Sequence, residues 1–286
     1  MKYIRSIAFL VALVSLGIAH PALAVVGDAT GLFIITKTGF VLNRATNTFD
    51  TTVSIKNTSP FTVSAPVQLS VSGLPNGVTL ANAAGTSQGK PYVNVAVPGN
   101  NIIPNAIITP IVLKFSNPAR VALAPKLDLS GDIPQYALGL PPDPGEAGKA
   151  TVAGIDSNGN GVRDDVERWI AFNYPASAKG RAALMQYARA YQRLILSGAA
   201  GNPADALTLD QQAADASACS GYTFGVRPGI LEQRKIFAEM LNTRARSLAY
   251  DQFNQFLAGQ IVDRPRKTIA DYRAACAGFD PDTLGN

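Results

Sequence analysis

Histidine is nearly absent from this sequence of 286 residues, whose single His is His20. His20 lies in a segment that we predict below to be removed, so the processed chain holds no imidazole. This absence excludes Ser-His-Asp and Cys-His catalysis and any zinc site with histidine ligands. The two Cys are too few for a four-cysteine metal site. Charged residues are also scarce, at 16%, while hydrophobic residues reach 47%, a balance that favours a globular chain.

The first 24 residues have the pattern of a secretory signal peptide. Lys2 and Arg5 precede an apolar run at residues 6–17, and Ala22-Leu23-Ala24 is a cleavage site of the small-x-small type. The run is shorter than the about 18 to 20 apolar residues that span a membrane, so an uncleaved anchor is the weaker alternative. We predict a signal peptide over residues 1–24, cut after Ala24. The product is then secreted or periplasmic, with no membrane span in the mature chain.

The charge distribution argues against nucleic acid as a partner. The formal net charge of +5 falls by two when Lys2 and Arg5 are removed. The densest basic cluster, at residues 264–267, has no interleaved aromatic residues to stack on bases, so it is interpreted as a solvated turn or helix start. The partner expected instead is a protein or a polysaccharide at the cell envelope, which the sequence does not identify.

Residues 25–124 are predicted to form a β-sandwich. Short runs alternate in polarity, as half-buried strands do, at residues 51–56, 67–71, 92–97 and 111–115. Turn residues separate them, because Gly and Asn accept a positive φ and Pro fixes φ. A resemblance to immunoglobulin-like or fibronectin type III-like modules of bacterial exported proteins is carried by TVSIKNTSP, VQLSVSGLPNGVTLANAAG, GKPYVNVAVPG and IIPNAIITPIVLKFSNP. The resemblance implies a spacing or adhesive module without catalytic residues.

A Pro-rich segment follows at residues 125–150, where five prolines stand among Gly and Asp. Such a composition is typical of an extended, semi-rigid chain. We therefore predict a linker over 125–150, followed by a helical domain with its calcium loop over 151–286.

Residues 156–167 read DSNGNGVRDDVE and fit the EF-hand loop pattern at every defined position. Gly161 stands at the sixth position, where the backbone bends sharply. Oxygen ligands recur at alternate positions, and an acidic residue at the twelfth can hold the ion with both oxygens. A hard cation with six to eight oxygen ligands suits this set, and Ca²⁺ suits it better than Mg²⁺. The predicted ligands are Asp156, Asn158, Asn160, Val162 through its carbonyl, Asp164 and Glu167.

The calcium interpretation has an alternative, in which the segment merely caps a helix. Asp164, Asp165 and Glu167 would then lie favourably at the positive end of the helix dipole. The preceding segment, residues 149–155, lacks helical periodicity. The loop therefore resembles the incomplete EF-hand, dockerin or thrombospondin type 3-like calcium loops of exported proteins. A single loop of this charge is expected to bind Ca²⁺ weakly, with Kd on the order of 10⁻⁴ to 10⁻³ M.

After the loop the apolar residues recur with helical periodicity. A single stripe runs through Leu184, Tyr187, Ala188, Tyr191, Leu194 and Ile195. Trp169, on the helix that leaves the loop, is expected to pack the calcium site onto this bundle. Cys219 and Cys276 are predicted to form a disulfide after export, and two buried free thiols are the alternative.

These observations together predict a multi-domain protein, in which an all-β Ig-like sandwich precedes an all-α domain that opens with an incomplete EF-hand-like loop. The second half resembles bacterial exported proteins in which an NGNGVRDDVERWI-like loop opens a helical domain, and this implies calcium and export but no activity. The predicted function is non-enzymatic: a surface, scaffold or interaction protein ordered by one Ca²⁺. The alternative is an exported hydrolase with a pair of carboxylates, as in glycosidases. Its candidate residues are Asp205, Asp210, Asp215, Glu232 and Glu239.

Overall fold

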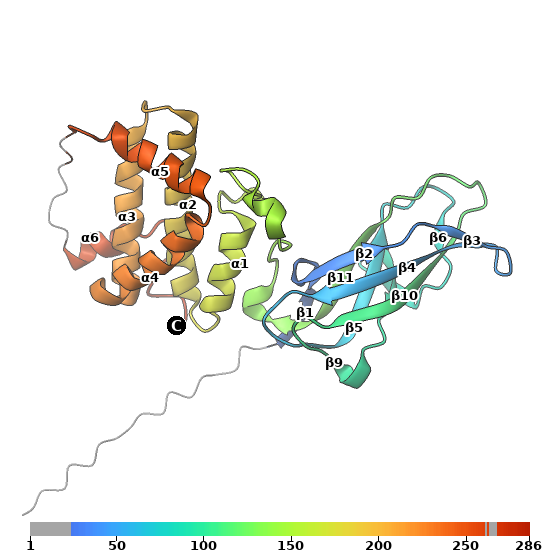
Figure 1. The fold of residues 1–286 in the computed structure, drawn as a ribbon. Helices are drawn as coiled ribbons and strands as arrows, with labels where there is room; N and C mark the ends of the chain where they lie inside the picture. The colour runs from blue at the N-terminus through green and yellow to red at the C-terminus, as the bar shows by residue number, and fades with distance from the viewer. Residues whose placement is uncertain (1–23, 261, 263–267) are drawn as a thin grey trace, which may run out of the picture.

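A computed structural model describes residues 24–260, 262 and 268–286, in which a strand-rich half precedes a helical half (Figure 1). The prediction of a protein built from a β part and an α part is confirmed. Residues 1–23 of the predicted signal peptide, and the basic cluster at 264–267, lie outside the described residues. Within the described part, no helix combines the length and the apolar character that a membrane crossing requires.

The strand-rich half contains two antiparallel sheets. The first has the order β1 (Ala24–Asp28), β11 (Lys126–Pro134), β5 (Val63–Ser72), β8 (Lys90–Asn94) and β7 (Gly85–Ser87), with β9 (Asn101–Ile102) paired to β5. The second has the order β2 (Phe33–Lys37), β4 (Thr48–Asn57), β10 (Ile107–Ser116) and β6 (Thr79–Leu80), with β3 (Val41–Asn43) paired to β4. Figure 1 shows the two sheets lying over each other.

One apolar core lies between the two sheets, because alternate residues of each strand point inward. Val53 and Ile55 of β4 are fully buried, and so is Leu113 of β10 in the same sheet. They belong to one cluster with Leu69 of β5 and Leu129 of β11 from the other sheet. Each such side chain stabilises the fold by about 1.5 to 3 kcal/mol through burial.

The predicted linker over residues 125–150 is wrong in its first part. Residues 126–134 form β11, which lies between β1 and β5 inside the first sheet. Leu129 and Ile133 alternate with polar neighbours and are buried. Gly131 allows a close approach, since a Cβ there would lie 3.1 Å from Val63 Cγ1. The remaining residues hold two short 3-10 turns, η3 (Gln135–Ala137) and η4 (Gly145–Lys149).

The helical half contains α1 (Asp164–Asn173), α2 (Ala178–Ala200), α3 (Ala206–Phe224), α4 (Val226–Met240), α5 (Arg244–Phe256) and the short α6 (Ile269–Ala274). The predicted stripe on α2 is confirmed as its core face, where Leu184 and Ile195 are fully buried. Ser177 caps α2 by accepting a hydrogen bond from the Gly180 N–H, and Gly201 ends it with a φ of 65°.

The predicted disulfide is confirmed, since Cys219 on α3 is bonded to Cys276 just after α6. The bond joins residues 57 apart in sequence and ties the end of the chain to the middle of the bundle. Trp169 packs against the apolar cluster that contains Val162 of the predicted loop, and its ring centroid lies 5.9 Å from that of Tyr174.

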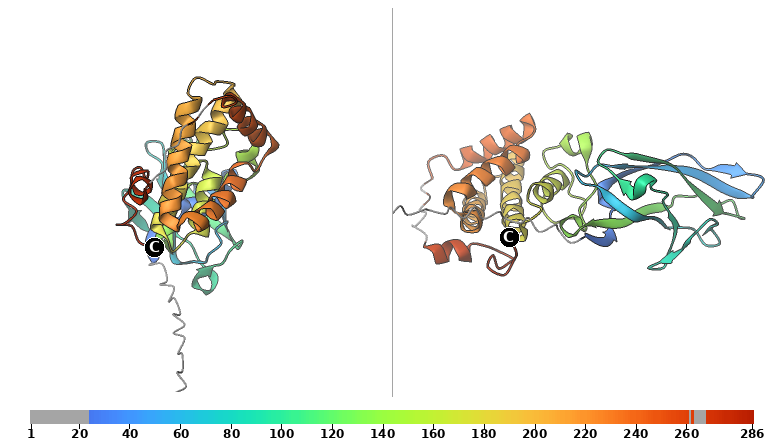
Figure 2. Two further views of the ribbon diagram at one scale, coloured as in Figure 1. Left: turned by 90° about the vertical axis from the view of Figure 1, so that its left-hand side faces the viewer. Right: turned by 90° about the horizontal axis from the view of Figure 1, so that it is seen from below.

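Helix α1 lies between the sheets and the other helices in Figure 1 and in the right-hand view of Figure 2. Arg168 of α1 is only 5% exposed, and its guanidinium donates to the carbonyl oxygens of Gly31 and, at 2.9 Å, Pro141. Phe172, one turn further along α1, packs edge-on against Phe61 at 6.1 Å between ring centroids. The two halves therefore meet through buried contacts made by α1.

Candidate metal centre

The predicted loop is a compact turn that ends where α1 begins. Gly159 and Gly161 take positive φ angles of 69° and 82°, which side-chain-bearing residues rarely adopt. The Asp164 N–H donates to the Ile155 carbonyl at 2.8 Å, so the residues on either side of the loop are drawn together. Residues 157–162 thus fold over a single small region, as the spacing of the pattern predicts.

Asp156, at the first position, organises the turn through both carboxylate oxygens. Its Oδ1 accepts from the Asn160 N–H at 3.1 Å, and its Oδ2 accepts from the Gly161 N–H at 2.8 Å. Hydrogen bonds from N–H groups to a carboxylate are stronger than those between neutral groups. The Asp156 side chain therefore lies inside the loop and holds its backbone in place.

The side chains at positions three, five and twelve converge on one point. The Nδ2 groups of Asn158 and Asn160 donate to the same oxygen, Glu167 Oε2, at 3.0 Å and 2.8 Å. Burial raises the pKa of the Glu167 carboxyl, although the two amide bonds lower it. The negative charges of Asp164 and Asp156 raise this pKa further, so the three carboxylates are close enough to repel one another.

The side chains at the two other predicted ligand positions make contacts with the loop backbone and with the helical core. Asp164 is 1% exposed, and its Oδ1 accepts from the Ser157 N–H at 2.9 Å, which braces the start of the loop. The Val162 side chain is buried in the helical core, and its N–H donates to Asn160 Oδ1 at 2.9 Å. Among the described residues, no group of three or more His, Cys, Asp or Glu side chains has an arrangement that could hold a metal ion.

The donor chemistry of the loop nevertheless suits a hard cation. A half-turn of the Asn158 and Asn160 amides about their Cβ–Cγ bonds exchanges nitrogen for oxygen on the side that faces Glu167. This rotation would gather oxygens from positions three, five and twelve, next to Asp156 at position one. Asp156, Asn158, Asn160 and Glu167 are therefore the residues that would hold Ca²⁺. Asp164 adds its negative charge near Glu167 and braces the loop backbone.

A buried arginine, which no sequence pattern marks, anchors the loop to the bundle. Arg163 is 1% exposed and donates to the Met240 and Glu239 carbonyls, at 2.9 Å and 3.0 Å, at the end of α4. This is the negative end of that helix dipole. The Nε and Nη2 groups of Arg163 also donate to the two carboxylate oxygens of Asp165, at 2.9 Å and 3.0 Å, and form a two-point ion pair.

Arg246 on α5 holds the segment that enters the loop. Its side chain is fully buried and donates to the carbonyls of Gly148, at 2.6 Å, and Thr151, at 3.1 Å. Burial and the neighbouring Arg163 lower the pKa of Arg246 to about 10. The loop is thus fixed on one side by Arg163 and on the other by Arg246, and no local sequence pattern marks either residue.

The carboxylates proposed for the alternative hydrolase do not meet in one cavity. Asp210 is the only one of the five that lines a cavity of about 440 Å³ along α3, and Asp215 lines a second cavity. Asp205 precedes α3 as its N-cap residue. Glu232 accepts from Tyr174 and from Lys235, the latter at 2.9 Å, while the Glu239 carbonyl accepts from Arg163. Two-carboxylate glycoside hydrolysis needs both groups on one substrate.

Comparison with protein-family models, with curated proteins and with solved structures found no match to this chain. The resemblances stated above therefore rest on the quoted residues alone. The geometry of the loop and of the helices around it is the basis for any function assigned to the protein.

Proposed function

We propose that this protein is exported and binds one structural Ca²⁺ through residues 156–167, as a non-enzymatic scaffold or interaction protein of the cell envelope. One observation carries the proposal: Asn158 and Asn160 both contact Glu167 Oε2, beside the carboxylate of Asp156. When bound, the ion supplies the positive charge that offsets the repulsion among the carboxylates. The chain itself supplies a loop whose backbone already turns around that point.

The proposed role is structural because the loop begins α1. Glu167 is both the twelfth loop position and a first-turn residue of α1. A ligand that fixes Glu167 therefore fixes the first turn of this helix. Since Arg168 of α1 also donates to the Gly31 carbonyl of the strand-rich half, the loop lies where it can order the junction between the two halves.

Export is supported by two independent features. The N-terminal 24 residues have the three parts of a signal peptide. The Cys219–Cys276 disulfide is of the kind that persists in oxidising compartments. In the strand-rich half, the two antiparallel sheets over one core support the proposal of an Ig-like spacing module.

The test is calorimetric melting of the processed protein in excess calcium and in chelator. A ligand at about 10 to 100 times its Kd stabilises the folded state by about 1.4 to 2.7 kcal/mol. We expect calcium to raise the melting temperature of the helical half by several degrees. The rise should vanish in Asp156→Ala and persist in Asp251→Ala, which removes an exposed carboxylate from α5.

The same melts in magnesium serve as the second control, because Mg²⁺ suits this oxygen set less well. If chelation leaves the helical transition unchanged, and calcium titration releases no heat, the segment is only a helix cap. The paired-carboxylate hydrolase has no comparable observation behind it, since no described cavity is lined by two of its candidate residues.

A further inference from the structure

A cavity lies in the helical half, on a face of α3 that has no large side chains. Its volume is about 440 Å³, within the roughly 300 to 1,000 Å³ typical of small-molecule sites. The floor is made of small residues at helical spacing, Ala213, Ala214, Ser217, Ala218 and Gly221. Helices α2, α4, α5 and α6 supply the walls.

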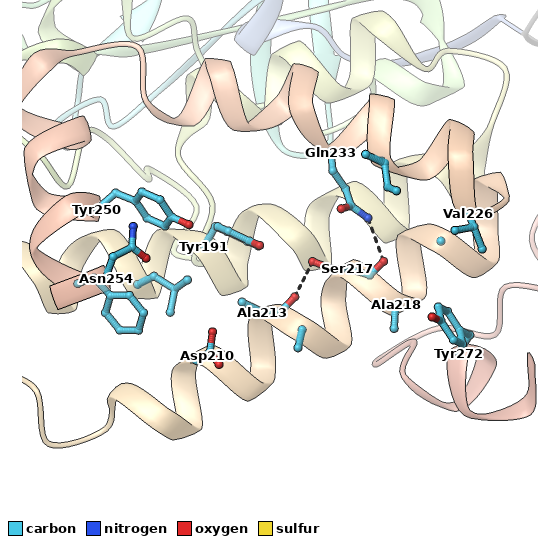
Figure 3. A pocket seen from close by; sticks show the side chains of 15 residues that line it. Tyr191, Asp210, Ala213, Ser217, Ala218, Val226, Gln233, Tyr250, Asn254 and Tyr272 are labelled. Atoms are coloured by element: carbon cyan, nitrogen blue, oxygen red, sulfur yellow. Dashed lines mark hydrogen bonds between the residues drawn. The ribbon is translucent and has the colours of Figure 1, made fainter. Parts of the chain in front are cut away.

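Figure 3 shows that the cavity runs along α3, with aromatic side chains toward both ends. Tyr191 and Tyr250 stand at one end, with ring centroids 6.4 Å apart. Tyr272 closes the other end, where its ring would lie 3.6 Å from a Cβ at Gly221. The rim is open to solvent, because Val226 is 63% exposed and Ile230 45%.

The polar groups of the cavity are mostly neutral. Gln233 uses its Nε2 to donate to the Ser217 carbonyl at 2.9 Å, and the exposed Asn254 amide lies beside Tyr250. No Lys, Arg or His is among the described residues that line the cavity, so a phosphate or carboxylate ligand would meet no opposite charge. Asp210, the single acidic residue of the lining, already has an interaction partner.

The remaining ligand classes differ in whether they can hydrogen-bond the side-chain amides of Gln233 and Asn254. A purely apolar ligand would cover Gln233 and Asn254 without hydrogen-bonding them, at a cost of about 1 to 3 kcal/mol for each group left unpaired. A ligand with hydroxyl groups on its edge and an apolar face meets both the amides and the tyrosine rings. A sugar ring has this combination.

We propose that this cavity binds a neutral saccharide of one or two rings, which stacks on the tyrosines at one end and hydrogen-bonds Gln233 and Asn254. The site gives the helical half a ligand of its own, beyond the structural role proposed for calcium. None of its lining residues belongs to the loop at 156–167. Either proposal can therefore fail without the other.

The experiment is titration calorimetry of the processed protein, in calcium, against neutral mono- and disaccharides built from glucose, galactose, mannose and N-acetylglucosamine. The test variant is Ala214→Trp, which fills the cavity from its floor. Its matched control is Gln211→Trp, at an exposed position of α3 outside the lining. We expect at least one saccharide to bind the parent and the control, and Ala214→Trp to weaken this binding by about tenfold or more.

The proposal is overturned if no saccharide in the set binds at about 10 mM, far above the usual range of specific Kd values. It is equally overturned if Ala214→Trp, melting like the parent, binds the saccharide as tightly as the parent does. Should Ala214→Trp fail to fold, the exposed Asn254→Leu takes its place and must show the same loss. Repeating the titration in chelator separates this site from the loop.

Discussion

Replacement of Arg168 by Met tests the contact through which the helical half meets the sheets. Arg168 is 5% exposed and donates to the carbonyls of Gly31 and Pro141, and its Nη2 also lies 3.2 Å from the Thr58 hydroxyl. Its guanidinium lies 5.2 Å from the centre of the Phe172 ring. Met has a similar apolar stem, so the change removes the charge and the donors and leaves most of the volume.

The expected loss follows from the two carbonyls that lose their donor. Each buried acceptor left unsatisfied costs about 1 to 3 kcal/mol. Removing a buried charge returns part of this, because the guanidinium no longer has to be desolvated. We therefore expect Arg168→Met to lower the free energy of unfolding by about 2 to 5 kcal/mol. Arg168→Lys should lose nearly as much, since an ammonium cannot copy the planar fork that reaches several acceptors.

The assay is urea unfolding followed by circular dichroism for the helices and by tyrosine fluorescence for both halves. In the parent the two signals should change together, and in Arg168→Met the helical signal should change at lower urea. Arg234→Met, at an exposed arginine on α4, is the control and should stay within about 0.5 kcal/mol of the parent. If Arg168→Met also stays within that range, the buried contact does not hold the halves together.

Two further perturbations bear on the helical half. Replacing Cys219 and Cys276 by Ser opens a loop of 57 residues and should lower the free energy of unfolding by about 4 kcal/mol, as measured by urea unfolding without reductant. In chelator, stability should rise as the pH falls toward the ordinary pKa of a Glu carboxyl. The reason is that the pKa of Glu167 is raised in the folded state, so the folded protein holds this proton more tightly than the unfolded chain does. That contribution is complete below the ordinary pKa and disappears as the pH rises through the raised one. Glu167→Gln should flatten this slope, and an unchanged slope would refute the assignment.

The sequence predicted the structure correctly where one spacing of apolar residues determines the secondary structure. The stripe through Leu184 and Ile195 predicted the core face of α2, and the two cysteines left one possible pairing. The prediction was wrong at β11, because the prolines of residues 125–150 were interpreted as a linker although nine of these residues form a strand. Pro134 ends that strand rather than interrupting it, and Pro is tolerated at such a position. Composition over a window of 26 residues hid the alternation of Leu127, Leu129 and Ile133 with polar or small residues.

In the candidate site, too, some features could be predicted from the sequence and others could not. The spacing of residues 156–167 predicted a tight loop that opens a helix, and Gly161 and Asp156 lie as the pattern requires. The position of Asp164 was not predictable, because its contact with the Ser157 N–H depends on the path of the backbone. Arg163 and Arg246 carry no signal at all, since arginine is normally exposed and only the folded chain shows which carbonyls surround it.

Helix α1 explains why the loop, the bundle and the sheets depend on one another. Its ten residues are too few to form a stable helix alone. Val166 and Ile170, four apart, face the helical core, while Arg168 and Phe172, also four apart, face the sheets. Glu167 lies on the third side, toward the loop. Because each contact holds the same short helix, strengthening the loop contact favours the helical conformation that the other two contacts need. The metal proposed for the loop would therefore stabilise the junction between the halves without touching the sheets.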